Sequence, residues 1–407
     1  MTSRAARPAV AGPSRLRPFR ALRYAATGRD LADLTLAPPA MWDFGSLGEL
    51  ARAHDHHVLR LLAPSLVSTS SALATASSTA SSTAAAWLAD GVLVADASAG
   101  LYVWRWSQQG SSVVGVAGAL GLPAKGVPPH EQVRPGLLAD RAHELGDGRV
   151  QPEPIMLLYD GALPLVSDDV EPAPLLDLRL DDGYHQVSRV RGRDAVARVE
   201  RALAGESLVV ADGHHRLAVL GDLPEPLPHA FVVVVDVGRS ELAVGPIPRV
   251  LPGLAWQTVL DTPRLATVAL DESTRQAFLA EPAPGRLRWV LGDRTRIVGL
   301  EAFAGVAGLR QDPSTCGPLA RDVCHLHADL LPAWGVDSDR VRYAHSWPAA
   351  CADASASDGL AVEARAASLA DVLAAGRTGT VLPHKATSIT PKPRAGLLML
   401  GDEPVLG

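Results

Sequence analysis

Hydrophobic and polar positions along the chain predict a mixture of short strands and short helices. Apolar runs typical of strands cover residues 101–106, 113–120, 154–159 and 207–211. Helical spacing of apolar positions covers residues 84–90, 137–145, 194–204, 216–220 and 319–334. Two further pairs of apolar runs flank turn residues and predict β-hairpins, 231–237 with 241–247 and 286–291 with 294–300. The mixture predicts an α+β (mixed α/β) fold with partly antiparallel sheets, and not a doubly wound Rossmann domain.

Two of these helices carry end signals in the sequence. Gly205 follows the helical pattern of 194–204 and is placed to end it. Ser368 with Asp371 resembles a capping pair that opens a helix, and we expect that helix to stop at Gly376.

The length of 407 residues is too great for one ordinary hydrophobic core, so we expect more than one domain. Residues 1–16 are expected to be a disordered leader. An N-terminal α/β domain is predicted over 17–260, and an additional C-terminal α/β region over 261–407. A serine, threonine and alanine tract at 65–83 is expected to be flexible.

Composition narrows the classes of protein to which the chain can belong. Apolar residues make up 47% and charged residues 20%, a balance typical of globular proteins. The net charge of -6 argues against nucleic acid as a partner. No apolar stretch has the roughly 18 residues of a membrane span, and residues 1–20 lack the apolar core of a secretory signal. The 3 cysteines include no Cys-x-x-Cys pair, which disfavours a disulfide framework and a cysteine zinc site. We therefore expect a cytoplasmic protein with no membrane partner, whose oligomeric state the sequence leaves open.

The densest group of chemically functional residues lies where the strand-like run 207–211 meets a helix. Amide groups at a helix start lack intrahelical partners and lie at the positive end of the dipole, so they favour an anion. An arginine there adds a fork of donors that matches phosphate. Adjacent histidines cannot lie on one helix face, so no metal site is expected. We predict a phosphate-binding turn formed by Asp212, Gly213, His214, His215 and Arg216. An ordinary polar helix start is the alternative.

Two loops carry further candidates. His130 and Glu131, followed by Asp140 and Arg141, can serve as an acid/base pair or bind a cation, although such a loop pair is more often surface decoration. The loop 383–396 holds cationic and hydroxyl side chains between prolines, which is a plausible phosphate or carboxylate cradle. A solvated turn is the alternative for this loop.

The lysine content draws attention to the second loop. Positive charge in this chain comes almost entirely from arginine, and the lysines are Lys125, Lys385 and Lys392. Two of them lie in the loop 383–396, so this loop is a stronger candidate for anion binding than its composition alone would make it.

Taken together, blocks spread along the whole chain resemble a known family. The blocks are Arg17-Pro-Phe-Arg-Ala-Leu-Arg-Tyr24, Ala37-Pro38-Pro39 with Trp42-Asp43, Pro129-His-Glu131 through Ala139-Asp-Arg141, Gln151-Pro-Glu-Pro-Ile155, Ala211-Asp-Gly-His-His-Arg216, Asp322-Val-Cys-His-Leu-His327, and Pro383-His-Lys385 through Pro391-Lys-Pro393 and Gly396. In this order they resemble the bacterial and archaeal family catalogued as domain of unknown function 1015. The chain departs from the family pattern at Leu138, Leu217, Pro248 and Ser388.

The resemblance implies a function as well as a family. The Asp-Gly-His-His-Arg block is similar to the phosphate-binding turn of the ParB/sulfiredoxin-like superfamily, which includes nucleotide-dependent free-serine kinases. It therefore implies a ParB/sulfiredoxin-like core with mixed, partly antiparallel sheets. It also implies a phosphotransferase that uses ATP or ADP with Mg²⁺ on a small hydroxyl metabolite such as free serine.

On this reading the candidate residues divide into two groups. The nucleotide phosphates would be bound by Asp212, Gly213, His214, His215, Arg216, Lys385, Lys392 and Arg141. Glu131 or Asp43 would orient the attacking hydroxyl and accept its proton, with assistance from His130.

Two other functions remain open from the sequence. The same anion turn would serve a non-catalytic regulator that binds a nucleotide or metabolite, and Leu138 in place of the family's lysine favours this mildly. A metal-dependent hydrolase could be built from His130, Glu131, Asp212 and His214.

Overall fold

The computed structural model describes most of the chain between Leu16 and Gly401. The described residues are 16–28, 30–38, 47–64, 76–128, 130–132, 138, 149–223, 227–281, 285–303 and 321–401. Residues 1–15 of the expected leader, 65–75 of the expected flexible tract, and nearly all of the helix expected over 137–145 lie outside them.

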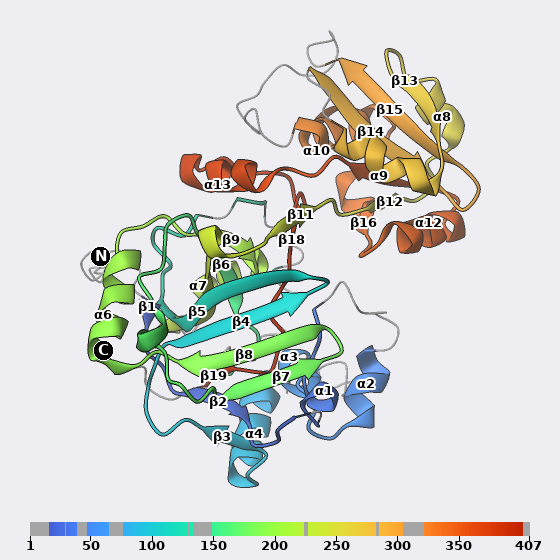
Figure 1. The fold of residues 1–407 in the computed structure, drawn as a ribbon. Coiled ribbons are helices and arrows are strands. Elements are labelled where there is room, and N and C mark those ends of the chain that lie inside the picture. Colours follow the sequence, from blue (N-terminus) through green and yellow to red (C-terminus); the bar gives the residue numbers. More distant parts are fainter. Residues whose placement is uncertain are drawn as a thin grey trace, which may run out of the picture.

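A large mixed sheet forms the centre of the first body of the structure (Figure 1). Its strands are β1 (Leu16–Arg17), β4 (Tyr102–Gln108), β5 (Ser111–Gly121), β6 (Ile155–Tyr159), β7 (Leu176–Leu180), β8 (Gly183–Arg189), β9 (Val209–Asp212) and β10 (His229–Asp236). They lie in the order β7-β8-β4-β5-β10-β6-β9, and β1 pairs with β5. The pairing of β6 with β10 is parallel, and the other pairings of this sheet are antiparallel.

Both faces of the large sheet are covered, which explains the uninterrupted apolar run of β10. Val232 and Val234 pack on one face against α6 (Gly192–Leu203). Val233 and Val235 pack on the other face in a core that includes α3 (Leu59–Leu62) and α4 (Ala76–Ala89). A strand that is buried on both sides has no solvent face on which polar residues would alternate.

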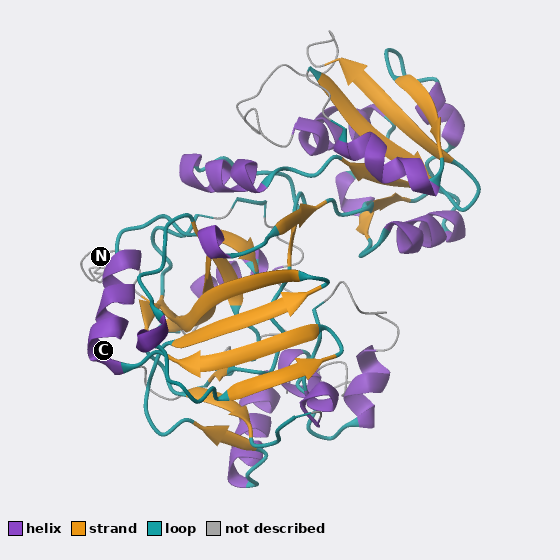
Figure 2. Ribbon diagram, in the orientation of Figure 1, coloured by secondary structure: helices purple, strands orange, loops and turns teal. Residues whose placement is uncertain are grey.

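A second, antiparallel sheet forms the other body (Figure 2). Its strands are β12 (Arg249–Leu251), β13 (Ala266–Leu270), β14 (Arg286–Gly292), β15 (Ile297–Phe303), β16 (Arg342–Tyr343) and β17 (Leu360–Ala364), in the order β13-β15-β14-β17-β12-β16. The helices are α8 (Trp256–Leu260), α9 (Glu272–Ala280), α10 (Arg321–His325), α11 (Leu331–Ala333) and α12 (Trp347–Ala356). One face of the sheet packs against α9 and α12.

One small sheet and one helix connect the bodies, and a further small sheet lies in the first body (Figure 1). The chain leaves the first body through β11 (Ala243–Gly245) and returns through α13 (Leu369–Thr378) and β18 (Ser388–Thr390), which pairs with β11 (Figure 1). The last strand, β19 (Met399–Leu400), pairs with β2 (Ala21–Tyr24), which also pairs with β3 (Leu93–Ala95). Segments from both ends of the chain therefore build the first body, and the predicted boundary at residue 260 stays a prediction.

The remaining described helices are α1 (Asp30–Leu34), α2 (Leu47–Ala53) and α7 (His214–Asp222). None of the helices in the described part of the chain is long and apolar enough to cross a membrane. The fold is thus a mixed α+β arrangement of several sheets with parallel and antiparallel pairing, as the sequence pattern predicts.

Most predicted elements are confirmed, but one predicted hairpin is wrong. The runs 286–291 and 294–300 do form the β14–β15 hairpin. The runs 231–237 and 241–247 do not pair, because β10 lies between β5 and β6 in the large sheet while β11 pairs with β18. The helix predicted over 84–90 begins earlier, at Ala76.

The end signals and the cysteines give a mixed result. Ser368 and Asp371 form the expected capping box of α13, although the helix runs past Gly376 to a left-handed C-cap at Gly379. Although the sequence disfavours a disulfide framework, Cys324 is disulfide-bonded, whereas Cys351 is a free, buried thiol.

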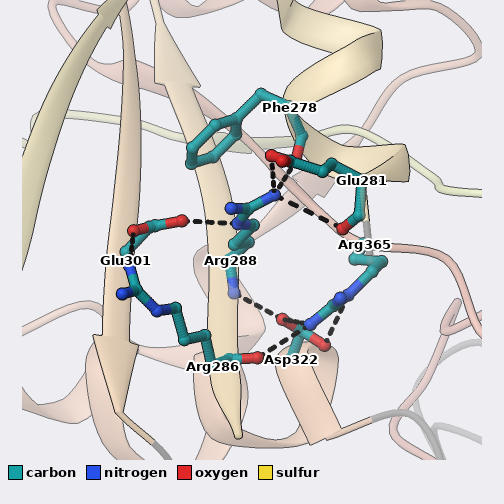
Figure 3. Close-up of polar contacts among 7 residues, drawn as sticks. All are labelled: Phe278, Glu281, Arg286, Arg288, Glu301, Asp322 and Arg365. Carbon is teal, nitrogen blue, oxygen red and sulfur yellow. Dashed lines mark hydrogen bonds and ion pairs between the residues drawn. The ribbon is translucent and has the colours of Figure 1, made fainter. Parts of the chain in front are cut away.

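A largely buried arginine–carboxylate network joins β14 and β15, two inner strands of the second sheet, to α9 and α10 (Figure 3). Arg288 on β14 donates to Glu301 on β15 and, at 2.9 Å each, to the Phe278 carbonyl and Glu281 carboxylate. Asp322 at the start of α10 accepts the Arg288 amide and the guanidinium of Arg365. The network satisfies the charges that the strand register places in the interior.

Replacing Arg288 by alanine is expected to lower the free energy of unfolding by about 3 kcal/mol. The buried carboxylate of Glu301 would then keep only Arg286, which is partly exposed, as a cationic partner. Arg342→Ala serves as the control, since Arg342 and Asp353 form an exposed pair that contributes less than about 1 kcal/mol. Urea denaturation followed by tryptophan fluorescence measures both. Equal losses in the two variants would contradict the assigned role of the network.

Candidate functional site

The turn between β9 and α7 has the backbone form that the sequence predicts for an anion site. Gly213 adopts a left-handed conformation with φ of 93° and is the N-cap of α7. Its carbonyl accepts the amide of Leu217 at 2.9 Å, which closes the first helical turn. The helix therefore begins at His214, and the amides of its first turn have no partner within the helix. Asp212 does not cap the helix with its side chain.

Asp212 instead accepts hydrogen bonds from two cationic side chains. Arg216, one turn into α7, donates to its Oδ2 at 2.9 Å. Lys392, the second residue after β18, donates to its Oδ1. The rest of the Arg216 guanidinium contacts Glu153, with 2.9 Å to its carbonyl and 3.0 Å to its carboxylate. Arg216 is thus directed at protein groups that hold the turn in place.

The ionisation of Asp212 follows from these contacts. Burial raises the pKa of its carboxyl, but the charges of Lys392 and Arg216 and the hydrogen bond from Lys392 outweigh burial, with a further contribution from Lys385. The net pKa lies well below its ordinary value, so the carboxylate is ionised at neutral pH.

A second polar chain lies beside the turn and is formed by Glu131, Thr387, His130 and His214. The Glu131 carboxylate accepts the Thr387 amide at 2.8 Å and the Thr387 hydroxyl at 2.5 Å. His130 Nε2 lies 3.1 Å from the same hydroxyl oxygen, and His130 Nδ1 lies 3.1 Å from His214 Nε2. The two imidazole rings meet edge to face, 4.6 Å apart.

Burial and charge set the protonation states along this chain. Burial raises the pKa of Glu131, but His214, His130 and the two hydrogen bonds from Thr387 outweigh burial, so its pKa is below the ordinary value. Burial lowers the pKa of His130, and lowers that of His214 to about 4, against the opposing charge of Glu131. At neutral pH the carboxylate is therefore ionised and both imidazoles are neutral.

These states fix the direction of each hydrogen bond. An ionised carboxylate only accepts, so the Thr387 hydroxyl donates to Glu131 and accepts from His130 Nε2. The neutral ring of His130 then accepts at Nδ1 from His214 Nε2, and the neutral His214 keeps Nδ1 as an acceptor. The chain thus ends in a nitrogen that can take a proton.

The loop that carries Lys385 is anchored by both bodies. Arg249 on β12, buried to 1% exposure, donates to the Lys385 carbonyl at 3.0 Å. His384 contacts the ring of Tyr343 from β16 on one side and the ring of His215 from α7 on the other, at 5.2 and 5.1 Å. Lys385 itself is exposed, with a left-handed backbone.

Both lysines of this loop lie within electrostatic reach of His345. Burial lowers the pKa of His345 first, and the charges of Lys385 and Lys392 lower it further. The second body therefore contributes side chains next to the turn, because β16 and the residues after it face the returning segment.

The structure brings together most of the residues that the sequence singles out. Contacts and chain adjacency place them in one region, which holds His130, Glu131, Asp212, Gly213, His214, His215, Arg216, Lys385 and Lys392. Two candidates, Asp43 and Arg141, lie outside the described residues. The chemical roles of all of them stay predictions.

Sequence reasoning missed three residues of this region. Thr387 is one of the hydroxyl residues of the predicted cradle, but nothing in the pattern indicates that it links Glu131 to His130. Arg249 acts through a contact with Lys385, 136 positions away, and no local signal marks it. His384 lies in the predicted cradle, but nothing in the pattern indicates its contact with His215.

Two cavities of the described chain lie outside this region. One, of about 600 Å³, is an open hollow between residues 124–128 and the end of α13 at 376–379. The other, of about 320 Å³, lies over β4, β5 and the end of β10. Neither is lined by any of the predicted site residues.

The described chain is therefore a mixed α+β protein with an ionised, cation-held aspartate at a strand-to-helix turn. It belongs to the family described as protein of unknown function (DUF1015), whose model matches residues 16–267. No curated protein matches the sequence.

The solved structures that match the chain have low similarity to it. SbnI from Staphylococcus aureus, truncated at its C-terminus, has a TM-score of 0.38 at 11% identity, covering 69% of this chain and 85% of its own. A free serine kinase variant in complex with ADP has a TM-score of 0.37 at 15% identity, covering 67% and 89%. A conserved hypothetical protein from Pyrococcus furiosus has a TM-score of 0.37 at 17% identity, covering 67% and 90%.

The partly buried imidazole of His214 is expected to make the protein less stable in acid. Its pKa is lowered from 6.5 to about 4 in the folded chain, so between these values the unfolded chain binds a proton that the folded chain does not. The free energy of unfolding therefore falls as the pH decreases from 6.5 to 4, and is unaffected by this group above 6.5.

The measurement compares urea denaturation of the wild type with that of His214→Gln between pH 7 and pH 4. The variant is expected to lose less stability over this range, because its side chain does not titrate. Parallel curves would show that His214 is not held neutral by the fold.

Proposed function

We propose that this chain is a nucleotide-dependent phosphotransferase that acts on the hydroxyl of a small molecule such as free serine, on a ParB/sulfiredoxin-like core. The observation that carries the proposal is the meeting of three sequence segments at the start of α7. The turn at 212–216, the pair at 130–131 and the loop at 383–392 contact one another there. Phosphoryl transfer depends mainly on positioned charge, which is what these segments supply.

The first group of residues is suited to binding phosphate. Amides at the start of a helix, together with its dipole, favour an anion, and Gly213 is the N-cap of α7 there. An ammonium has three N–H donors, so Lys392 can hold Asp212 and still donate to a phosphate oxygen. Lys385 is exposed within reach of the same carboxylate. We assign Arg216 the role of positioning Asp212, because its donors contact Asp212 and Glu153.

The second group is suited to receiving the proton of the attacking hydroxyl. Glu131 holds Thr387, Thr387 orients His130, and His130 orients His214 with an acceptor nitrogen at its Nδ1. The low pKa of His214 makes it a weak base, which is sufficient for a reaction in which positioning dominates. Asp43 stays a prediction as an alternative acceptor.

The donor set fits a nucleotide with Mg²⁺ better than a metal held by the protein alone. Among the residues that the structure describes, no group of three or more His, Cys, Asp and Glu side chains could hold a metal ion. Magnesium usually needs only one or two carboxylates besides substrate phosphates, and Asp212 is an ionised carboxylate beside the anion turn. When bound, ATP or ADP would supply the phosphoryl group, and Mg²⁺ would neutralise its charge.

The same donor set bears differently on the two alternative functions, the hydrolase and the regulator. The metal-dependent hydrolase built from His130, Glu131, Asp212 and His214 draws no support from the described residues, because their side chains do not converge as a metal cluster. A non-catalytic regulator would use the same anion turn and is distinguished only by the absence of turnover.

The test incubates the protein with ATP or ADP, Mg²⁺ and a panel of hydroxyl-bearing amino acids, and follows the products by ³¹P NMR. The wild type is expected to form a phosphomonoester. Glu131→Gln is expected to bind nucleotide normally but to turn over at least about 100-fold more slowly, because the proton-accepting chain is disturbed. Lys392→Ala is expected to weaken nucleotide binding by about 1.5–3 kcal/mol.

Lys125→Ala is the matched control, since Lys125 is the lysine outside the loop and should leave binding and turnover unchanged. Nucleotide binding without any phosphomonoester would favour the regulator. A wild type that binds neither nucleotide and forms no product would overturn the proposal.

A further inference from the structure

The cavity of about 320 Å³ lies on the face of the large sheet that packs against α6, away from the candidate site. Its floor includes the cross-strand pairs Val103–Val116 and Arg105–Val114 of β4 and β5. The segment 163–170, which follows β6, forms its wall. Its volume is at the lower end of the roughly 300–1,000 Å³ of small-molecule sites.

One buried carboxylate lies in this mostly apolar cavity, whose other polar lining residues are Arg105, Ser167 and Arg239. Asp236, the last residue of β10, lines the cavity and is only 1% exposed. Its Oδ2 accepts the Leu163 amide at 2.9 Å and lies 3.6 Å from Arg239 Nε. Its Oδ1 is fully buried and has no hydrogen-bond partner among the described residues.

A buried carboxylate oxygen without a partner is costly, and a ligand that pairs with it recovers that cost. The pairing group must be a donor, because the Asp236 Oδ1 oxygen is an acceptor. An ammonium group supplies both donors and the opposite charge. Arg239 compensates the charge only in part, since its guanidinium is half-exposed and lies on the Oδ2 side.

The side chains that line the cavity indicate the chemistry of the rest of the ligand. Seven of the eleven lining residues are valine or leucine. Val166 on the wall is 65% exposed, which is unusual for a large apolar side chain in this chain. A short, branched apolar body would bury this surface against the sheet.

The cavity and the candidate site lie at opposite ends of β6. Met156 near its start pairs with Asp212, and Tyr159 at its end pairs with Asp236. Met156 and Tyr159 are three residue steps apart along the strand, a distance of ~10 Å. A ligand in the cavity would therefore contact the same strand that supports the turn, without sharing any residue with the candidate site.

We infer that this cavity is a binding site for a small, branched apolar molecule with a primary ammonium group, in which Asp236 Oδ1 accepts from the ammonium and the valine and leucine side chains enclose the apolar body.

Three probes of similar shape test the inference, namely isoamylamine, isoamyl alcohol and isovalerate, with binding to the full chain measured by saturation-transfer NMR titration. Isoamylamine is expected to bind the wild type about tenfold or more tightly than isovalerate, with the alcohol between them. Asp236→Asn is expected to weaken isoamylamine binding by about tenfold or more. Asp177→Asn, which changes an exposed carboxylate on β7, is the matched control and should bind as the wild type does.

Val114→Phe provides a second variant that keeps the hydrogen bond of Asp236 to Leu163 and fills the cavity. It is expected to abolish isoamylamine binding, and it decides the matter if Asp236→Asn fails to fold by circular dichroism. The inference is overturned if isoamylamine does not bind the wild type at millimolar concentration. It is also overturned if isovalerate binds equally well, or if Val114→Phe binds as the wild type does.

Discussion

The carboxylate of Asp212 accepts hydrogen bonds from one cation on the helix that follows it and from another on a segment 180 positions further along the chain. Arg216 fixes the carboxylate relative to α7 and to the chain that enters β6, through its bonds to Glu153 and Pro154. Lys392 then fixes the returning segment relative to the same carboxylate. The three side chains are 15–25% exposed and Asp212 has two cations, so removing one of them costs less than the ~3–5 kcal/mol typical of a fully buried ion pair.

The position of Lys392 depends in turn on how the returning segment is held. β18 pairs with β11, and the Lys392 carbonyl accepts from Gln108 at 3.3 Å. Two residues further on, the buried guanidinium of Arg394 donates to Thr35, at 2.7 Å, and to Asp182, at 2.8 Å. The lysine therefore projects from a segment that is fixed on both sides, which is the rigidity that a binding residue needs.

Much of this arrangement is encoded locally and could be predicted from the sequence. The strand, the left-handed glycine and the helix of the turn follow from an apolar run, a Gly and a helical pattern within 14 positions, 207–220. The roles of Arg249 and Thr387 could not be predicted, because each depends on a contact between segments far apart in the chain. The hairpin predicted around Gly238 is wrong for the same reason, since β10 finds better burial between β5 and β6 than beside its neighbour in sequence.

The most direct measurement of the central claim is a two-dimensional ¹H–¹⁵N TROSY titration of the full chain with ADP and Mg²⁺. If the start of α7 and the loop around Lys392 form one anion site, the amides of 213–216 and 385–392 should shift together, with a common dissociation constant. Shifts confined to another part of the chain, or none at saturating nucleotide, would contradict it.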